Sequence, residues 1–369
     1  MKVTPAISVY LLLVLGILLL TPTLDYTDQT LPTALFITAR TALLILASLL
    51  PILTLIKVMK RKDTSMFLLS NFWLSALALF SLMPMLEAVF TLIPMSNHTN
   101  QSLASKTWQL YYGNKSVLLQ DPSTEVRASG AARKQIVFIG DSFTQGAGLK
   151  SISMRYSDLL EESLRDCADV FNFGRDGYST TEELEVINGL IDFPDIMVLQ
   201  YFFNDPDMIC HEALGWYPEL DVYAELPYVA RTVITRSYLA NFIFFRTYDF
   251  PMMDSYMRFF TDCFRDQKAI KMYAQQVDSI VDYCQNNEIT LLVLVIPHPV
   301  QPESTAPQDR IVQKMYENRG VTVIMADSVL NQLPLSQRII SNQDLHLSEL
   351  GNQQIAELLY PILRSQCGD

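Results

Sequence analysis

From Gln135 onward the sequence alternates between short apolar runs and longer amphipathic segments. The strand-like apolar runs cover residues 135–140, 169–173, 195–202, 290–296 and 321–325. Helical periodicity covers residues 154–166, 180–191, 268–287, 308–318 and 349–365. Strands separated by helices of this length pair in parallel, through right-handed crossovers. The pattern therefore predicts an α/β fold: a three-layer α/β/α sandwich with a parallel sheet, of the flavodoxin-like type.

The first 95 residues differ from the rest, because three apolar blocks make up most of them. The blocks cover about residues 4–24, 31–56 and 66–94, with Arg40 and Glu87 as their only charged residues. Each block reaches the length of about 20 apolar residues that spans a bilayer. We therefore expect a membrane anchor of three transmembrane helices. For the first block alone, a cleaved signal peptide is an alternative, since Lys2 precedes the apolar run.

Basic residues predict the orientation of this anchor. They cluster between the second and third blocks, as Lys57, Lys60, Arg61 and Lys62. Short loops rich in Lys and Arg stay on the cytoplasmic side. The third block then runs outward, which places the chain from about residue 96 in the periplasm or outside the cell. We interpret polar residues 96–134 as a linker, with a short strand expected around Trp108 to Tyr112.

Two charged residues lie within the predicted membrane segments. Arg40 and Glu87 both fall near the outer ends of their blocks. They could pair with each other, since intramembrane charges commonly have partners. The preferred interpretation is that each side chain reaches the interface separately, as long charged side chains do near helix ends.

Charge and cysteine content limit the function further. The formal net charge of −12 argues against nucleic-acid binding. All five cysteines (Cys167, Cys210, Cys263, Cys284 and Cys367) fall beyond the predicted anchor, which fits an oxidising compartment. A Cys210–Cys263 disulfide, if formed, would close a loop of roughly 50 residues and contribute about 4 kcal/mol on the chain-entropy model. Cys210-His211 lacks a second spaced ligand pair, so no metal site is predicted.

The first strand of the α/β pattern ends at a candidate nucleophile. The apolar run from Ile136 stops at Gly140, and Asp141-Ser142 follow. In open α/β sheets, ligands bind at the carboxyl ends of the strands, which is where this turn falls. A serine nucleophile needs a base and an oxyanion site. His346 near the C-terminus and Asn204 after another apolar strand are candidates for these roles.

Four blocks along the chain, in order, resemble the SGNH (GDSL-type) hydrolase family. They are Gly140-Asp141-Ser142, Asn172 to Thr181 with Gly174 and Gly177, Tyr201 to Asp205 with Asn204, and Asp344-Leu345-His346. The resemblance covers about residues 135–365 and implies an SGNH hydrolase-like fold for residues 135–369. It does not extend to the membrane segments.

The resemblance also implies roles for single residues. Ser142 would be the nucleophile, His346 the general base and Asp344 the acid that orients it. The backbone amides of Ser142 and Gly177, with the Asn204 side chain, would bind the oxyanion. No metal and no organic cofactor is implied.

The blocks depart from the family pattern at two positions. Phe202 stands where the third block usually has glycine, which would crowd the oxyanion site or reshape the substrate pocket. The acid usually precedes the histidine by three residues, where this chain has Gln343, whereas Asp344 precedes His346 by two. Residues two apart on extended backbone point to the same side, so contact is still expected. In the second block, Gly174 is the alternative to Gly177.

Residues 206–265 interrupt the α/β alternation and are dense in aromatic side chains. They begin directly after Asn204-Asp205, at the sheet edge where a site would lie. One interpretation is a satellite core beneath the insertion. The other is a lid or acyl-binding wall, facing the membrane through interfacial Trp and Tyr.

The sequence thus predicts a membrane-anchored, extracytoplasmic serine esterase that cleaves acyl esters through an acyl-Ser142 intermediate. Its substrate would be an acyl ester of a cell-surface glycan or lipid. Two alternatives stay open: an O-acyltransferase that passes the acyl group to an envelope glycan, and a catalytically silent protein of the same fold that binds or assembles. The sequence does not indicate an oligomeric state.

Overall fold

The computed structural model describes residues 37–49, 53, 82–97, 101–109, 133–247 and 252–367. The chain divides into two compact units. The first comprises residues 1–111 and 221–249, and the second comprises residues 112–220 and 250–369. The middle of the aromatic insertion therefore belongs to the same unit as the N-terminal segments.

The second unit is built on a five-stranded parallel sheet in the order β2-β1-β3-β4-β5. Its strands are β1 (Lys134–Ile139), β2 (Ala168–Asn172), β3 (Ile196–Tyr201), β4 (Thr290–Val295) and β5 (Thr322–Met325). The central strands are buried on both faces, as the continuous apolar runs predict for a parallel sheet. Each of the five predicted strands is present.

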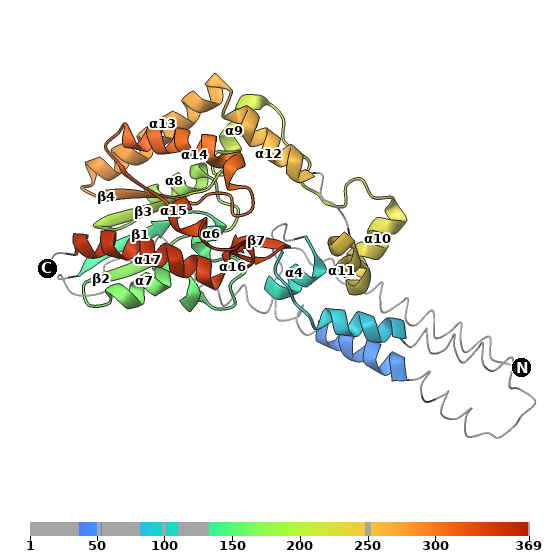
Figure 1. Cartoon of the computed structure of the whole chain (residues 1–369). Helices are drawn as coiled ribbons and strands as arrows, with labels where there is room; N and C mark the ends of the chain where they lie inside the picture. Colours follow the sequence, from blue (N-terminus) through green and yellow to red (C-terminus); the bar gives the residue numbers. More distant parts are fainter. Residues whose placement is uncertain are drawn as a thin grey trace, which may run out of the picture. The chain divides into compact units, whose positions relative to one another are not determined.

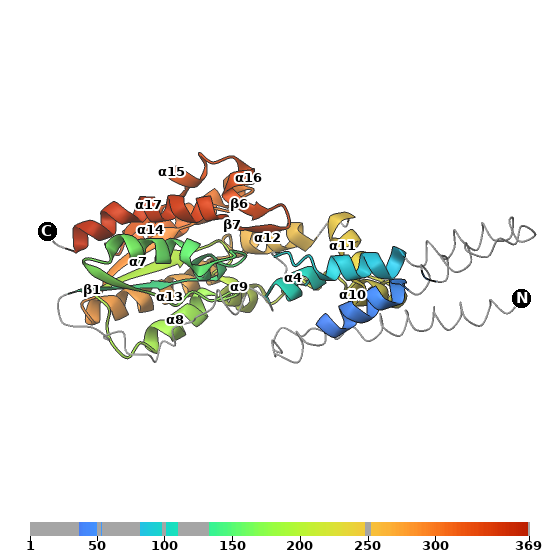
Figure 2. The ribbon, with the colours of Figure 1, turned by 90° about the horizontal axis from the view of Figure 1, so that it is seen from below.

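Helices cover both faces of this sheet. They are α7 (Tyr156–Leu164), α8 (Thr180–Asn188), α13 (Gln267–Asn286), α14 (Pro302–Glu317) and α17 (Glu349–Gln366). Helices α7 and α17 lie side by side on one face, and α8, α13 and α14 lie on the other (Figures 1 and 2). This is the three-layer arrangement that right-handed crossovers produce. The predicted α/β/α sandwich is confirmed.

A small hairpin follows the sheet and was not predicted. Strand β6 (Ile339–Ser341) pairs antiparallel with β7 (Asp344–Leu347), just before α17. The hairpin matters because β7 carries both the candidate acid and the candidate base.

Two disulfides join segments of the second unit. Cys210 bonds Cys263, the pairing that the sequence left open, and Cys167 bonds Cys367. Cys284 is a buried free thiol, which accounts for the odd count. The loop closed by Cys210–Cys263 spans 53 residues, so the stabilisation of about 4 kcal/mol applies.

The first unit is helical wherever the structure describes regular structure in it. Its helices cover residues 37–49 and 82–91, followed by α4 (Leu103–Trp108), α10 (Tyr228–Arg236) and α11 (Tyr238–Thr247). The strand expected around Trp108 is wrong at that residue, because Trp108 ends helix α4. The Ser102 hydroxyl caps this helix by accepting from the Ser105 amide.

A buried ion pair crosses the first unit. Arg40 Nη2 lies 2.8 Å from Glu87 Oε1, and both side chains are almost fully buried. The Glu87 carboxylate also accepts from the backbone amides of Tyr238 (2.7 Å) and Leu239 (3.0 Å) and from the Ser237 hydroxyl (2.8 Å). The preferred interpretation of separate snorkelling was therefore wrong. The pair forms because the first turn of α11 supplies the additional donors that a buried carboxylate needs.

No helix among the described residues is long and apolar enough to cross a bilayer. The predicted segment 4–24 lies outside those residues, as does the basic cluster at 57–62. Segments 31–56 and 66–94 are described only in part.

The aromatic residues of the insertion divide between the two units. In the second unit, α9 (Asp207–Leu214) and α12 (Met252–Cys263) contribute to the main core, where Phe259 and Phe260 are fully buried. In the first unit, Tyr223 and Phe244 stack with ring centroids 5.8 Å apart. These rings serve as core within their own units, in line with the satellite-core interpretation.

Candidate active site

Ser142 stands at the carboxyl end of β1, on the first turn of the short helix α6 (Ser142–Gln145). Asp141 precedes this helix and caps it, since its Oδ1 accepts from the Phe143 amide at 2.9 Å. A Cβ on Gly140 would lie 2.3 Å from Thr144 Oγ1 and 2.5 Å from Gln200 Oε1. Only glycine therefore permits the tight exit from the strand that brings Ser142 to the sheet edge.

His346 links the serine to an acid. Its Nε2 lies 2.9 Å from Ser142 Oγ, and its Nδ1 lies 2.6 Å from Asp344 Oδ1. The His346 backbone amide donates to the same Asp344 oxygen at 3.2 Å. Both residues lie on β7, where a spacing of two places side chains on one face. The structure thus brings Ser142, His346 and Asp344 together, with Asp344 rather than Gln343 against the imidazole.

The imidazole is strongly polarised by its surroundings. Burial lowers the pKa of His346, but the charge and hydrogen bond of Asp344, with the charges of Asp176 and Asp141, outweigh it and raise the pKa to about 9. With Nδ1 donating to Asp344, Nε2 of the neutral ring is left to accept the Ser142 hydroxyl proton. Burial raises the pKa of Asp141 to about 7.

The two glycines of the second block have different surroundings. A Cβ on Gly174 would lie 2.4 Å from the Gln145 nitrogen, and its own amide donates to Asn172 Oδ1 at 2.9 Å. Gly177 is exposed, has φ +77°, and has open space where a Cβ would be. Gly174 therefore packs the second block against α6, whereas Gly177 has free space around it, and its role as an oxyanion donor stays a prediction.

Asn204 and Asp205 form the turn after β3. Asp205 Oδ2 accepts from the Phe202 amide at 3.0 Å, and its carbonyl accepts from the Thr180 amide at 2.9 Å. Asp205 thus fixes this turn and joins it to the start of α8. The Asn204 side chain hydrogen-bonds Tyr256 on α12. The C-terminal part of the insertion therefore contacts the turn after β3.

Phe202 occupies the usual glycine position without backbone strain. Among the described residues, the only non-glycine with positive φ is Glu288. Phe202 therefore has a backbone conformation that does not require glycine. Its ring lies 4.3 Å from Phe143 and is stacked on His298 at 6.2 Å. Phe143 in turn lies 5.2 Å from the His346 ring. The rings of Phe143, Phe202 and His298 thus form an aromatic wall beside His346. The sequence did not predict this wall.

His298 is held rigidly in that wall. Its Nδ1 accepts from the backbone amides of Val300 (3.2 Å) and Gln301 (3.0 Å). Arg338 fixes the same loop by donating to the Pro299 carbonyl at 2.9 Å. His298 is buried beside Phe202 and is therefore part of this aromatic wall.

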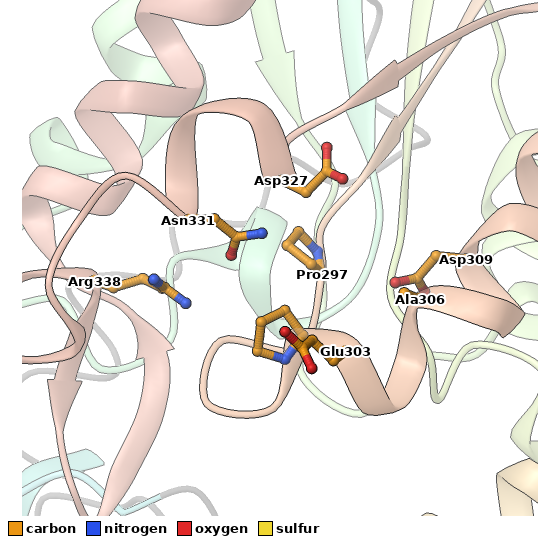
Figure 3. A pocket seen from close by; sticks show the side chains of 8 residues that line it. Pro297, Glu303, Ala306, Asp309, Asp327, Asn331 and Arg338 are labelled. Carbon is orange, nitrogen blue, oxygen red and sulfur yellow. The ribbon is translucent and has the colours of Figure 1, made fainter.

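A cavity of about 340 Å³ opens beyond this loop, near the ends of β4 and β5. Figure 3 shows the side chains that line it: Pro297, Pro302, Glu303, Ala306, Asp309, Asp327, Asn331 and Arg338. Burial raises the pKa of Asp309 to about 7. Ser142 and His346 are not part of this lining.

No group of three His, Cys, Asp or Glu side chains that could hold a metal ion occurs in the part of the chain that the structure describes. Cys210, considered above with His211, is bonded to Cys263.

No family model matches the sequence, and no curated protein matches it. Solved structures similar to this chain include TesA (15% identity, TM-score 0.41, covering 63% of this chain and 99% of that one). Others are a member of the lipolytic protein G-D-S-L family from Veillonella parvula (11%, 0.39, 63% and 98%) and an acetylxylan esterase from Geobacillus stearothermophilus (13%, 0.39, 65% and 96%). Likenesses this remote carry no argument about activity, so the proposal below rests on the residues of this chain.

Proposed function

We propose that this protein is a serine hydrolase of acyl esters that works through an acyl-Ser142 intermediate. The observation that carries the proposal is the hydrogen-bonded series Asp344–His346–Ser142, with distances of 2.6 and 2.9 Å. A nucleophile, a base and an orienting acid within hydrogen-bond reach form the arrangement that activates a serine hydroxyl. The series lies at the carboxyl edge of a parallel sheet, where such folds bind ligands.

The first half of the reaction follows from these contacts. Ser142 Oγ attacks the ester carbonyl carbon while His346 Nε2 takes the hydroxyl proton. The carbonyl π electrons move to oxygen, and Asp344 stabilises the imidazolium that forms. When the tetrahedral intermediate collapses, the carbon–oxygen bond to the alcohol breaks. The alcohol leaves with the proton from Nε2, and the acyl group stays on Ser142.

The second half repeats these steps with water. His346 takes a proton from the water as its oxygen attacks the acyl-Ser142 carbonyl. Collapse breaks the bond to Oγ, which recovers its proton from the imidazolium and releases the carboxylic acid. In both halves, the amides of Ser142 and Gly177 and the Asn204 side chain are the proposed oxyanion donors. Each such donor lowers the barrier by roughly 3 kcal/mol.

The proposal extends to the location of the enzyme. We infer a three-helix membrane anchor in residues 1–95, a linker at 96–134 and an extracytoplasmic catalytic domain at 135–369. The apolar blocks and the basic cluster at 57–62 support the anchor and its orientation. The disulfides Cys167–Cys367 and Cys210–Cys263 fit an oxidising compartment. An enzyme tethered there would act on acyl esters of surface glycan or lipid.

Steady-state turnover of short acyl esters tests the proposal, with Ser142→Ala as the variant. We expect ester cleavage by the wild type that the variant lacks. Adding a sugar hydroxyl acceptor separates hydrolysis from transfer: free acid as the main product supports the esterase, and acylated acceptor supports an O-acyltransferase. Equal turnover by folded wild type and Ser142→Ala would contradict a serine mechanism of either kind.

A further inference from the structure

Three carboxyl groups are buried near the ends of β1 and β3 and in the first turns of α8. Asp141 follows β1, Glu183 lies on α8 and Asp205 follows β3, and each is about 1% exposed. Asp141 Oδ2, Asp205 Oδ1 and both carboxylate oxygens of Glu183 have no hydrogen-bond partner among the described residues. Buried polar atoms in folded proteins are nearly always paired, so this concentration of unpaired acceptors needs an explanation.

The three carboxyl groups act on one another. Burial first, and then the Asp141 charge, raise the pKa of Glu183 well above its usual value. Burial and the charges of Glu183 and Asp141 do the same for the pKa of Asp205. The other titratable or charged groups that interact with this cluster are Glu182, Asp176, His346, Tyr156, Tyr201, Tyr256, Tyr273 and Tyr316. His346 is the single cation in that set.

Ionised carboxylates only accept hydrogen bonds, so three of them cannot satisfy each other. The Gln200 amide adds one buried donor, directed at Asp141, whose pKa it lowers. Gln200 Oε1 already accepts from the Asp141 amide (3.2 Å) and the Thr144 hydroxyl (2.8 Å), which fixes its orientation. A proton carried by one of the carboxyl groups would supply a donor within the cluster.

We propose that Glu183 is a positioning residue of the catalytic site, whose neutral carboxylic acid donates a hydrogen bond within the Asp141–Glu183–Asp205 cluster. Asp141 caps the helix that carries Ser142, and Asp205 fixes the turn that carries Asn204. Glu183 lies on the helix that starts beside Gly177 and is tied to Asp205 through Thr180. One shared proton thus fixes the position of the nucleophile relative to the oxyanion donors.

Two substitutions at this position separate positioning from packing. Glu183→Gln keeps the shape, the neutral charge and a donor, whereas Glu183→Leu keeps an apolar volume without any donor. We expect Glu183→Gln to stay close to the wild-type rate and Glu183→Leu to lose about ten-fold or more in kcat with KM little changed. Glu185→Gln, an exposed neighbour on α8, is the matched control and should change neither constant.

These kinetics rest on the proposed function, whereas an infrared measurement does not. In the full-length protein at neutral pH, we expect the carbonyl stretch of protonated carboxylic acids, to which Asp309 also contributes with its pKa of about 7, to lose intensity in Glu183→Gln and to keep it in Glu185→Gln. A band whose intensity is unchanged in Glu183→Gln would overturn the proposal even if the Leu variant failed to fold. Wild-type kcat in Glu183→Leu would also overturn it, as would a Gln variant as slow as the Leu variant. Loss of band intensity in Glu183→Gln, together with a wild type that turns over no ester, would instead count against the proposed function alone.

Discussion

Nδ1 of His346 lies 2.6 Å from Oδ1 of Asp344, although Asp344 precedes it by two residues on the same strand. The same oxygen accepts from the His346 backbone amide at 3.2 Å, so both donors of the histidine point at one acceptor. Extended backbone makes this contact possible, because side chains two apart share a face. Gln343, one residue earlier, lies in the turn that precedes β7.

The first prediction separates these two neighbours. Asp344→Asn leaves the imidazole without a charged partner and favours the wrong tautomer. We expect kcat to fall by about three to four orders of magnitude, as in other triads. Gln343→Ala is the matched control and should retain wild-type kcat in the same ester assay. A large loss in Gln343→Ala with a small one in Asp344→Asn would contradict the assignment of the acid.

The pH dependence of kcat/KM follows from the raised pKa of His346. The base works only when neutral, and its pKa is about 9 in the free enzyme. We expect kcat/KM to rise about ten-fold per pH unit up to that value and then to level off. Asp176 is exposed and its charge helps to raise this pKa, so Asp176→Asn should move the profile to lower pH. A profile that levels off near pH 6 in the wild type would contradict the electrostatic account.

Stability should change in the opposite direction over the same range. The pKa of His346 is higher in the folded chain than its ordinary value of 6.5. The contribution of its charged pair with Asp344 is therefore complete below about pH 6.5 and is lost as the pH rises through about 9. Thermal unfolding of wild type and Asp344→Asn at both ends of this range measures it. The difference between them should shrink as the pH rises.

The fourth prediction concerns the proposed oxyanion donor of the third block. Asn204→Ala should lower kcat by about 10²–10³ while KM changes little, because the donor is needed mainly in the transition state. Asn342 on the exposed hairpin turn gives a matched substitution, Asn342→Ala, that should be silent. A variant in which KM rises and kcat is unchanged would place Asn204 in substrate binding instead.

Much of the fold was predictable because parallel strands buried on both faces leave unbroken apolar runs. Runs such as Ile136–Ile139 show in the sequence, and so do the helices between them. The β6–β7 hairpin was not predictable, since strands of three or four residues carry no period. The helix at Leu103–Trp108 was also missed, because its capping residue Ser102 lies in a polar stretch that resembles a linker.

The residues of the candidate site also divide into those that the sequence predicts and those that it does not. Ser142, His346, Gly177 and Asn204 could be named because each belongs to a block with fixed spacing. Glu183 and the wall formed by Phe143, Phe202 and His298 could not, because their roles depend on contacts between distant elements. Arg40 and Glu87 show a further limit: the sequence placed both charges, but the donors at the start of α11 that stabilise their pairing come from 150 residues later in the chain.

The fifth prediction tests this ion pair. Glu87→Ala leaves the Arg40 guanidinium buried without its partner and removes the acceptor of the Tyr238 and Leu239 amides. Breaking a buried pair in this way costs about 3–5 kcal/mol of stability. We expect a lower melting temperature of the full chain in detergent. Glu225→Ala, an exposed carboxylate of the same unit, should leave the melting temperature unchanged. Equal melting temperatures for Glu87→Ala and wild type would show that the pair contributes nothing.

The central claim is that His346 activates Ser142 as a nucleophile. Labelling of the detergent-solubilised protein with a fluorophosphonate tests it most directly, because the probe reacts with an activated serine without any knowledge of the natural ester. We expect covalent labelling of the wild type that is abolished in Ser142→Ala and strongly reduced in His346→Ala. Folded wild type that stays unlabelled, or labelling that persists in Ser142→Ala, would contradict the claim.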